Sequence, residues 1–251
     1  MLTSPRATPV PPFRDPETPN PARVQDWALG GSRNTALDRT FGEGLQHGFP
    51  LRELTQDNHG FRSRAVRYCL DRDMLQVLDL GAGLNLDGLY GVDSDDVTAV
   101  LVDHDPVVIA CHRTVLEQQP RRQVSAIEAD LRDPAAVLAH PALVATLDLT
   151  EPVLLLLTAV GHHLTNADDP RRLIADYVSA LAPGSYLALT HLAPTPELPE
   201  QQNALNTTIA AYAAHGYCLC PRDSDHHPGV CLANGVSACS VSRFQRPASG
   251  H

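Results

Sequence analysis

The sequence predicts an α/β protein with a Rossmann-like, mostly parallel sheet and a helical extension on its N-terminal side. Residues 77–83 form an apolar segment that carries Asp79 near its end and breaks into a glycine turn. Residues 100–105 form a second apolar segment that ends on acids. Further apolar segments alternate downstream with segments of helical periodicity. Because parallel strands need crossover connections, which are usually helices, this alternation is typical of a parallel sheet.

The N-terminal part is expected to contain an arm and a helical extension. Residues 1–21 hold many of the prolines and predict a flexible arm. Residues 22–73 predict the extension. It has a helical pattern over residues 22–41, interrupted at Gly30 and Gly31, and a longer helix over residues 51–71. We expect the exposed face of this longer helix to carry Arg62, Arg64 and Arg67.

The core is expected over residues 74–215, and residues 216–251 are expected to be irregular because they show no clean period. The leucine-rich fourth strand is unbroken, which is typical of a strand covered on both faces. Asp133 is expected to cap a short helix. The five strands are predicted over residues 75–80, 98–102, 123–127, 152–159 and 185–191, with longer helices over residues 106–118, 170–181 and 203–215.

Composition narrows the classes of function. The chain has 251 residues and a formal net charge of −10, and all 19 of its basic residues are arginine. The lack of lysine excludes Schiff-base chemistry and the lysine-dependent phosphate loop. The acidic balance argues against a broad nucleic-acid surface. Residues 1–21 lack the apolar core of a signal peptide, and the longest apolar run, residues 153–160, is too short for a bilayer. We therefore expect a cytoplasmic protein with no membrane partner and with six reduced cysteines.

The glycine turn indicates a nucleoside-type ligand. Gly81 and Gly83 let the backbone approach a ligand closely. The third glycine of the dinucleotide fingerprint is missing at its usual spacing, which disfavours a pyrophosphate. The shorter pattern of acid, aliphatic, glycine, small residue and glycine is used by S-adenosylmethionine sites, where Asp79 would orient the amino group of the ligand. The alternative is a plain turn that binds nothing.

Two further acids lie where such a ligand would need them. Asp103 ends the second strand and can accept both ribose hydroxyls, with His104 beside it. Asp130 follows the third strand and can accept from the adenine amino group, while the adjacent backbone at Leu131 contacts the ring. The alternative is that both aspartates simply cap loops. Their joint position at the carboxyl ends of consecutive strands favours binding.

Histidines and cysteines supply the remaining candidates. His162 and His163 follow the fourth strand, where either could act as a general base or line the adenosine pocket, unless they are ordinary polar loop residues. A late cluster could suggest zinc, but its spacing is not that of a zinc knuckle, and we expect no metal. The members of that cluster are Cys218, Cys220, His226, His227, Cys231 and Cys239.

Taken in order, these segments resemble a family of S-adenosylmethionine-dependent methyltransferases that was once described as a domain of unknown function and is common in actinobacteria. The resemblance covers about residues 19–212. It departs from the family pattern in residues 84–96, which are short and make a poor helix. The matching segments are residues 20–24 (NPARV), 26–31 (DWALGG), 64–68 (RAVRY), 78–84 (LDLGAGL), 102–108 (VDHDPVV), 129–134 (ADLRDP), 168–170 (DDP) and 181–187 (LAPGSYL).

The resemblance implies a class I methyltransferase fold, S-adenosyl-L-methionine as cofactor, and an N-terminal extension whose Arg23, Asp26 and Asn34 close the cofactor pocket. We therefore expect methyl transfer to a small-molecule acceptor, with His162 or His163 as base. One alternative is a degenerate protein that binds the cofactor without turnover. Another is an NAD-dependent oxidoreductase, which fits the sheet but lacks the glycine fingerprint.

Overall fold

A seven-stranded sheet forms the centre of the molecule, with the strand order β3-β2-β1-β4-β5-β7-β6. The computed structural model describes residues 18–84, 97–118, 123–194, 198–222, 231–233 and 237–243, the last two as backbone only. The strands are β1 (Gln76–Leu80), β2 (Thr98–Asp103), β3 (Val124–Glu128), β4 (Leu154–Leu157), β5 (Tyr186–Leu192), β6 (Cys231–Ala233) and β7 (Ser237–Arg243). Strands β1 to β5 pair in parallel, whereas β7 is antiparallel to β5 and β6 is antiparallel to β7. The predicted mostly parallel sheet is confirmed.

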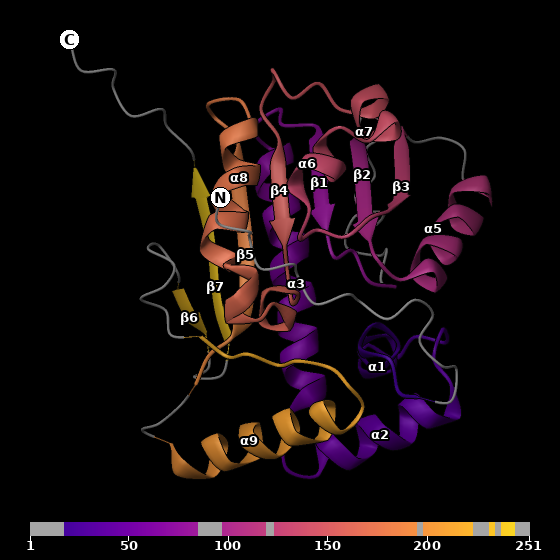
Figure 1. Ribbon diagram of the computed structural model, residues 1–251, viewed down its shortest axis with the longest axis vertical. Helices are drawn as coiled ribbons and strands as arrows, with labels where there is room; N and C mark the ends of the chain where they lie inside the picture. Colours follow the sequence, from indigo (N-terminus) through magenta and orange to yellow (C-terminus); the bar gives the residue numbers. More distant parts are fainter. Residues whose placement is uncertain are drawn as a thin grey trace, which may run out of the picture.

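Alternate residues of the central strands face two different layers of helices, as strand geometry requires. Leu78, Val100 and Leu155 face one layer, where they pack with α6, α7 and α8. Val77 and Leu156 face the other layer, which contains α3. Figure 1 shows α6 and α8 in front of the sheet and α3 behind it. The helices of these layers are α3 (Leu51–Leu70), α5 (Pro106–Gln118), α6 (Pro134–Leu138), α7 (Pro141–Thr146) and α8 (Pro170–Ala180).

Three further helices form a cap below the carboxyl ends of the parallel strands (Figure 1). We call α1 (Pro21–Ala28), α2 (Ala36–Gln46) and α9 (Pro199–Ala214) the helical cap. Their buried side chains share one cluster with the first turn of α3, and Phe41 of α2 meets Tyr212 of α9 edge to face at 5.1 Å. Helix α9 therefore packs with the N-terminal extension, although it follows the sheet strands in sequence.

Local sequence explains where the cap helices begin. The Asn20 side chain accepts from the backbone N–H of Ala22 at 2.9 Å and caps α1, and Thr35 forms a capping box with Asp38 at the start of α2. Asp38 also accepts from Arg23 Nε at 2.7 Å, which ties α1 to α2. The predicted break at Gly30 and Gly31 is confirmed, since α1 ends before it and α2 begins after it.

Two expectations about particular segments are wrong. Residues 216–251 are not irregular throughout, because β6 and β7 lie within them and β7 pairs with β5 along its whole length. Their alternating small residues give little hydrophobic periodicity, which is why the strands were not predicted. Arg62 does not belong to the exposed face of α3, since it is only 6% exposed. Of the expected arm over residues 1–21, residues 1–17 lie outside the described residues, whereas Asn20 is buried and Pro21 already begins α1. Of the expected poor helix over residues 84–96, residues 85–96 also lie outside the described residues.

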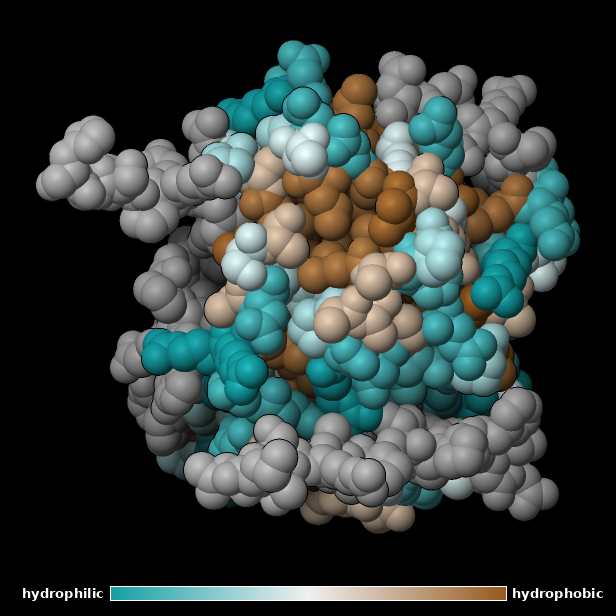
Figure 2. Space-filling model, turned by 45° about the horizontal axis from the view of Figure 1, so that its top comes forward, coloured by the Kyte–Doolittle hydropathy of each residue, from teal (hydrophilic) through white to brown (hydrophobic). Residues whose placement is uncertain are grey.

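The face of the molecule in Figure 2 carries an apolar area. In Figure 2, hydrophobic residues gather in the middle of the visible face and hydrophilic residues surround them. Among the described large hydrophobic residues, Val144 of α7 is the most exposed, at 64%. None of the described helices combines the length and the apolar character that a bilayer crossing needs.

Candidate functional site

The carboxyl ends of β1 and β4 mark the point where the strand order reverses, and open α/β sheets bind ligands at such a point. The turn after β1 runs against β2, with Gly81 N–H donating to the Val102 carbonyl at 2.8 Å. Gly81 and Gly83 have φ angles of +74° and +62°. A Cβ added to Gly81 would lie 2.5 Å from a methyl group of Val160, whereas one added to Gly83 would meet no atom of the described residues within 4 Å. Among the described residues, open space therefore adjoins the backbone at Gly83.

Asp103 lies directly beside this turn. Its Oδ2 accepts from Gly83 N–H at 3.0 Å, and its Oδ1 accepts from Asp105 N–H at 2.9 Å. The residue is 8% exposed, and burial raises the pKa of its carboxyl group while the two N–H donors oppose that rise. His104 is half exposed, with its Nδ1 3.6 Å from Asp103 Oδ1. The tips of β1 and β2 thus meet, as a ligand spanning both would require.

Asp79 lies inside the protein instead of facing open space. It is fully buried, and its carboxylate is paired with the guanidinium of Arg62 from α3. Burial raises the pKa of the Asp79 carboxyl, and the charge of Arg62 opposes this effect. The sequence analysis missed this partner. Arg62 lies on the same side of α3 as Thr55 and Asn58, three and four residues apart, and that polar spacing was the available signal.

Asp130 and Leu131 are held at the tip of β3. Arg132 donates to Asp130 through Nη2 at 2.6 Å and also approaches Asp168 at 3.8 Å. Burial opposes ionisation of Asp130, but the hydrogen bonds from Arg132 outweigh it and lower the pKa of the carboxyl. The Leu131 carbonyl accepts from the hydroxyl of Tyr177 at 2.8 Å. The Asp130 carboxylate is therefore ordered but already engaged by an arginine.

The three candidates from the extension differ in position. Arg23 is bound to Asp38 and to the backbone of Thr18, at 2.7 and 2.9 Å. Asp26 is buried, and its Oδ2 accepts from Arg33 N–H at 2.7 Å and from the Asn34 side chain at 2.8 Å. Of Arg23, Asp26 and Asn34, only Asp26 lines one of the two hollows described below. The other two hold it or its helix in place.

That hollow, which we call the glycine-turn pocket, lies between the cap, α3 and the turn after β1. Its empty volume of about 420 Å³ includes solvent at its mouth. Both glycines of the turn line it, and so do Asp26 and Arg62. An acidic side chain, Asp26, and a basic side chain, Arg62, therefore line the same pocket as Gly83. Asp79, Asp103 and Asp130 do not line it.

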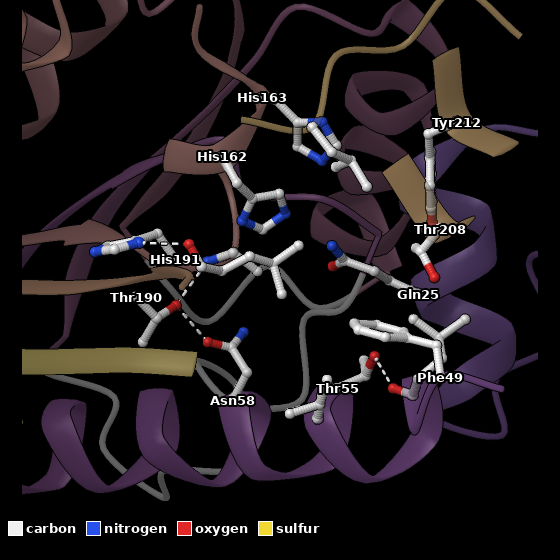
Figure 3. Close-up of a pocket in the computed structure, with 15 residues that line it drawn as sticks. Gln25, Phe49, Thr55, Asn58, His162, His163, Thr190, His191, Thr208 and Tyr212 are labelled. Atoms are coloured by element: carbon white, nitrogen blue, oxygen red, sulfur yellow. Dashed lines mark hydrogen bonds between the residues drawn. The ribbon is translucent and has the colours of Figure 1, made fainter. Parts of the chain in front are cut away.

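A second hollow, which we call the histidine pocket, adjoins the first. It is lined by His162, His163 and His191 together with apolar residues, and its empty volume of about 620 Å³ includes solvent at its mouth. Gln25, Thr55 and Asn58 line both pockets. Figure 3 shows Thr55 and Asn58 rising from α3 on one side, with His162 across from them.

The turn that carries His162 is held from two directions. Ala159 precedes it with a φ of +56°, and its N–H donates to the hydroxyl of Thr190 at 2.8 Å. Residues 217–222 lie along its other side, where Cys220 N–H donates to the His162 carbonyl at 2.7 Å. Arg222 donates to the Gly161 carbonyl at 2.9 Å. A strained backbone held by several bonds is typical of a functional position.

His162 is neutral in this environment. The residue is 7% exposed, and its Nδ1 has no hydrogen-bond partner among the described residues. Burial lowers the pKa of the ring well below its ordinary value, and the neighbouring His163, His191 and Arg222 lower it further. His163 differs, because its Nδ1 donates to the Cys218 carbonyl at 3.0 Å.

The cysteines and histidines of the late cluster form no metal centre in the described part of the chain, where no group of three or more potential ligands gathers. The structure pairs Cys218 with Cys220, whose Cα atoms lie 6.2 Å apart, a separation that a disulfide can bridge. The two side chains are therefore adjacent, and the expectation of six reduced cysteines stays a prediction. An extended Cys-x-Cys segment places both side chains on one face, which brings them together. His226 and His227 lie outside the described residues.

The comparisons with known proteins agree with this geometry. A family model described as S-adenosyl methyltransferase matches residues 11–225. The chain belongs to the S-adenosyl methyltransferase family. S-adenosyl-L-methionine is therefore its cofactor, as predicted. No curated protein matches the sequence.

Solved structures support the same family and fold. A putative methyltransferase from Thermobifida fusca is 28% identical, with 91% of this chain and 96% of that chain covered and a TM-score of 0.77. A DUF574 family protein from Streptomyces avermitilis is 26% identical, with 91% and 98% covered and a TM-score of 0.81. An O-methyltransferase family protein from Burkholderia thailandensis, at 15% identity, covers 77% of this chain and 57% of its own, and its TM-score of 0.54 shows the fold alone. The predicted class I methyltransferase fold is confirmed, and none of these findings supports the oxidoreductase alternative.

One residue that holds the methyltransferase's glycine turn was not predicted. His112 of α5 is fully buried, and its Nε2 lies 2.7 Å from the Gly83 carbonyl. Because a carbonyl only accepts, Nε2 carries the proton and Nδ1 does not. Burial is the main reason that the pKa of His112 falls to about 4. Neutral His112 therefore holds the glycine turn in place through the Gly83 carbonyl.

His112 is expected to make the fold sensitive to acid. Its pKa is about 6.5 in the unfolded chain and about 4 in the folded one, so the unfolded state binds the proton first as pH falls. The stability that depends on neutral His112 is complete above about pH 6.5 and is lost between about pH 6.5 and pH 4, up to about 3 kcal/mol. Guanidinium unfolding at several pH values checks this. His112→Gln should remove that part of the slope, whereas His47→Gln, at an exposed position, should keep it.

Proposed function

We propose that the protein transfers the methyl group of S-adenosyl-L-methionine to a small-molecule acceptor. The observation that carries this proposal is the pair of adjoining pockets at the switch point of the sheet, one charged beside a glycine turn and one with a buried neutral histidine. The first would hold the donor and the second would hold the acceptor. Residues that line both, such as Asn58, would lie between them.

The chemistry of the glycine-turn pocket suits the amino-acid end of the donor. Asp26 offers a carboxylate to an ammonium group, and Arg62 offers a guanidinium to a carboxylate. The open space at Gly83 admits a ligand that a side chain would exclude. This assigns to Asp26 the role that the sequence analysis gave to Asp79, whose carboxylate is buried against Arg62.

The nucleoside end would extend from the turn toward β2 and β3. Asp103, with His104 beside it, would accept from the ribose hydroxyls, because each of its oxygens keeps a lone pair after binding one N–H. Asp130 and the backbone at Leu131 would contact the adenine. Arg23 and Asn34 would act indirectly, by holding α1 and Asp26 in place.

The chemical demands on the protein are modest. When bound, S-adenosyl-L-methionine supplies a methyl group that is already activated on a sulfonium. The chain must then bind both partners, orient them and accept a proton. Orientation alone supplies about 7–11 kcal/mol in favourable cases. His162 is the proposed base because it is neutral and lines the acceptor side, with His163 next to it.

Asp103→Ala tests the donor site. Removing the ribose acceptor is expected to weaken binding of S-adenosylmethionine by about 1–3 kcal/mol, or about 5- to 150-fold in Kd. Calorimetry on the purified chain measures this, with Glu117→Ala on the exposed face of α5 as a matched control. Equal affinity for Asp103→Ala and the parent protein would refute the ribose assignment. Lack of binding by the parent protein would refute the function, and binding without turnover would identify the degenerate alternative.

Gly83→Ala and Gly81→Ala are expected to fail in different ways. Both place a side chain at a positive φ, which costs about 1–2 kcal/mol of stability. At Gly83 the new methyl enters open space in the pocket, so donor affinity should fall at least about 10-fold in a folded protein. At Gly81 it meets Val160, so stability should fall by about 1–3 kcal/mol more. Unfolding curves and calorimetry on both variants separate the two effects, and a Gly83→Ala protein with unchanged affinity would contradict the placement of the donor.

A further inference from the structure

We propose that the histidine pocket takes an uncharged, flat acceptor with a phenol- or enol-type hydroxyl, held between Asn58 and His162. This inference rests on the proposed function, because it names the substrate class of the second pocket. It is carried by the charge, the shape and the hydrogen-bonding groups of the described residues that line the pocket.

The described lining of the histidine pocket is uncharged. Among the described residues, the lining of the histidine pocket contains no aspartate, glutamate, lysine or arginine. A carboxylate or ammonium group placed there would lose its hydration without gaining an opposite charge, which is unfavourable by several kcal/mol. The neighbouring glycine-turn pocket contrasts with this, since Asp26 and Arg62 line it. The two pockets therefore select for different ligands, one zwitterionic and one uncharged.

Much of the lining of the histidine pocket is apolar. Phe49 and two residues of the first turns of α3, Leu51 and Leu54, line the pocket, as do Leu192 and Leu219. Phe49, Leu51 and Leu219 are buried members of the same cluster as the cap helices, so their positions are set by packing. A wall of one phenylalanine and several leucines favours a flat apolar body such as an aromatic ring.

Asn58 lines both pockets and offers a polar group on the side of the histidine pocket that adjoins the glycine-turn pocket. The Thr190 hydroxyl donates to Asn58 Oδ1 and accepts from Ala159 N–H at 2.8 Å. This arrangement orients the amide of Asn58, so that its NH₂ group is the part that can donate to a ligand oxygen. Across the pocket in Figure 3 lies His162, whose ring lines the pocket opposite Asn58. An oxygen between the two would receive one hydrogen bond and give another.

The basicity of His162 limits which hydroxyl groups it can deprotonate. A neutral imidazole held below its ordinary pKa is a weak base, and it removes a proton efficiently only from a fairly acidic hydroxyl. Phenols and enols are such hydroxyls, whereas alkyl alcohols are far less acidic. In the transfer, a bond would form between the hydroxyl oxygen and the methyl carbon as the bond from that carbon to the sulfonium breaks, and the sulfonium would become a neutral thioether. The proton of the hydroxyl would pass to His162. Charge and oxidation state balance without any further reactant.

The test compares three probes with the same ring system. Binding of 2-naphthol, 2-naphthoate and 2-naphthylmethylammonium to the full chain is measured by calorimetry, with and without saturating S-adenosylhomocysteine. The Kd for 2-naphthol is expected to be at least about 10-fold lower than for either ion, because only the ions lose charge hydration. Equal or tighter binding of either ion, or no binding of 2-naphthol, would overturn the proposal.

Variants at Leu54 locate the bound probe. Leu54 lines the histidine pocket only, so Leu54→Asp and Leu54→Phe should weaken 2-naphthol binding at least about 10-fold and leave affinity for S-adenosylhomocysteine within about 2-fold. The second variant fills space without adding charge. Leu37→Asp, at a 37% exposed position of α2 that lines neither pocket, is the matched control. If both Leu54 variants bind 2-naphthol like the parent protein, the probe binds elsewhere and the proposal is wrong.

The two levels of the proposal fail separately. A protein that binds S-adenosylhomocysteine but prefers 2-naphthoate would refute the ligand class and keep the proposed methyl transfer. A protein that binds 2-naphthol through Leu54 but does not bind S-adenosylhomocysteine would refute the methyl transfer and keep the ligand class.

Discussion

Arg62→Met is expected to destabilise the fold by about 3–5 kcal/mol, because it leaves a buried carboxylate without its counter-charge. Asp79 is fully buried on the side of β1 that faces α3, and Arg62 reaches it from that helix. Its Oδ1 already has no partner among the described residues, so little else can compensate. Guanidinium unfolding of the purified chain measures the loss. Donor affinity should fall as well, because Arg62 also lines the glycine-turn pocket.

Two companion variants show whether the ion pair is the cause. Arg64→Met, two residues away on the exposed face of α3, should change stability by less than about 0.5 kcal/mol. Replacing both partners, as Arg62→Met with Asp79→Leu, should recover most of the stability, since an apolar pair needs no charge compensation. An Arg62→Met protein that unfolds at the same denaturant concentration as the parent would show that the pair contributes nothing.

The sheet and most helices could be predicted because their signals are local. The leucine run of β4 and the acid-tipped β1 and β2 are identified by their own residues, and a proline opens α5 and α8. Helix α9 was expected over residues 203–215 and begins earlier, at Pro199. The glycine turn and Asp103 were correctly placed next to each other, because parallel strands end at one edge of a sheet. These inferences need no knowledge of what packs against each segment.

The missed features depend on which segments meet in space. Whether Arg62 faces solvent depends on where α3 lies against the sheet, and helical periodicity alone placed it with Arg64 on the exposed side. The role of His112 depends on its distance from Gly83, which lies 29 residues earlier in the chain. The histidine pocket joins α1, α3, the turn after β4 and residues beyond α9. Such a site has no sequence pattern of its own, although its separate residues were visible.

His162→Gln is expected to lower the rate of methyl transfer by about 10²–10⁴-fold, because glutamine keeps a hydrogen-bonding side chain but accepts no proton. His162 lines the histidine pocket and not the glycine-turn pocket, so affinity for S-adenosylmethionine should stay within about 2-fold of the parent. The rate of methyl transfer is measured with a hydroxyl acceptor by monitoring the release of S-adenosylhomocysteine. The affinity for S-adenosylmethionine is measured by calorimetry. His163→Gln is the matched control, because the Nδ1 of His163 already serves the Cys218 carbonyl and its loss should lower the rate much less.

The pH profile gives a second, independent check on the same residue. Burial, together with His163, His191 and Arg222 around the ring, holds the pKa of His162 well below its ordinary value. The base form is therefore already present at neutral pH. Because the deprotonated ring is the active form, acidification should lower the rate only well below the pH at which an ordinary histidine titrates. A rate that falls steadily from pH 8 to pH 6, or a His163→Gln variant that loses more activity than His162→Gln, would assign the base to a different group and remove His162 from the mechanism.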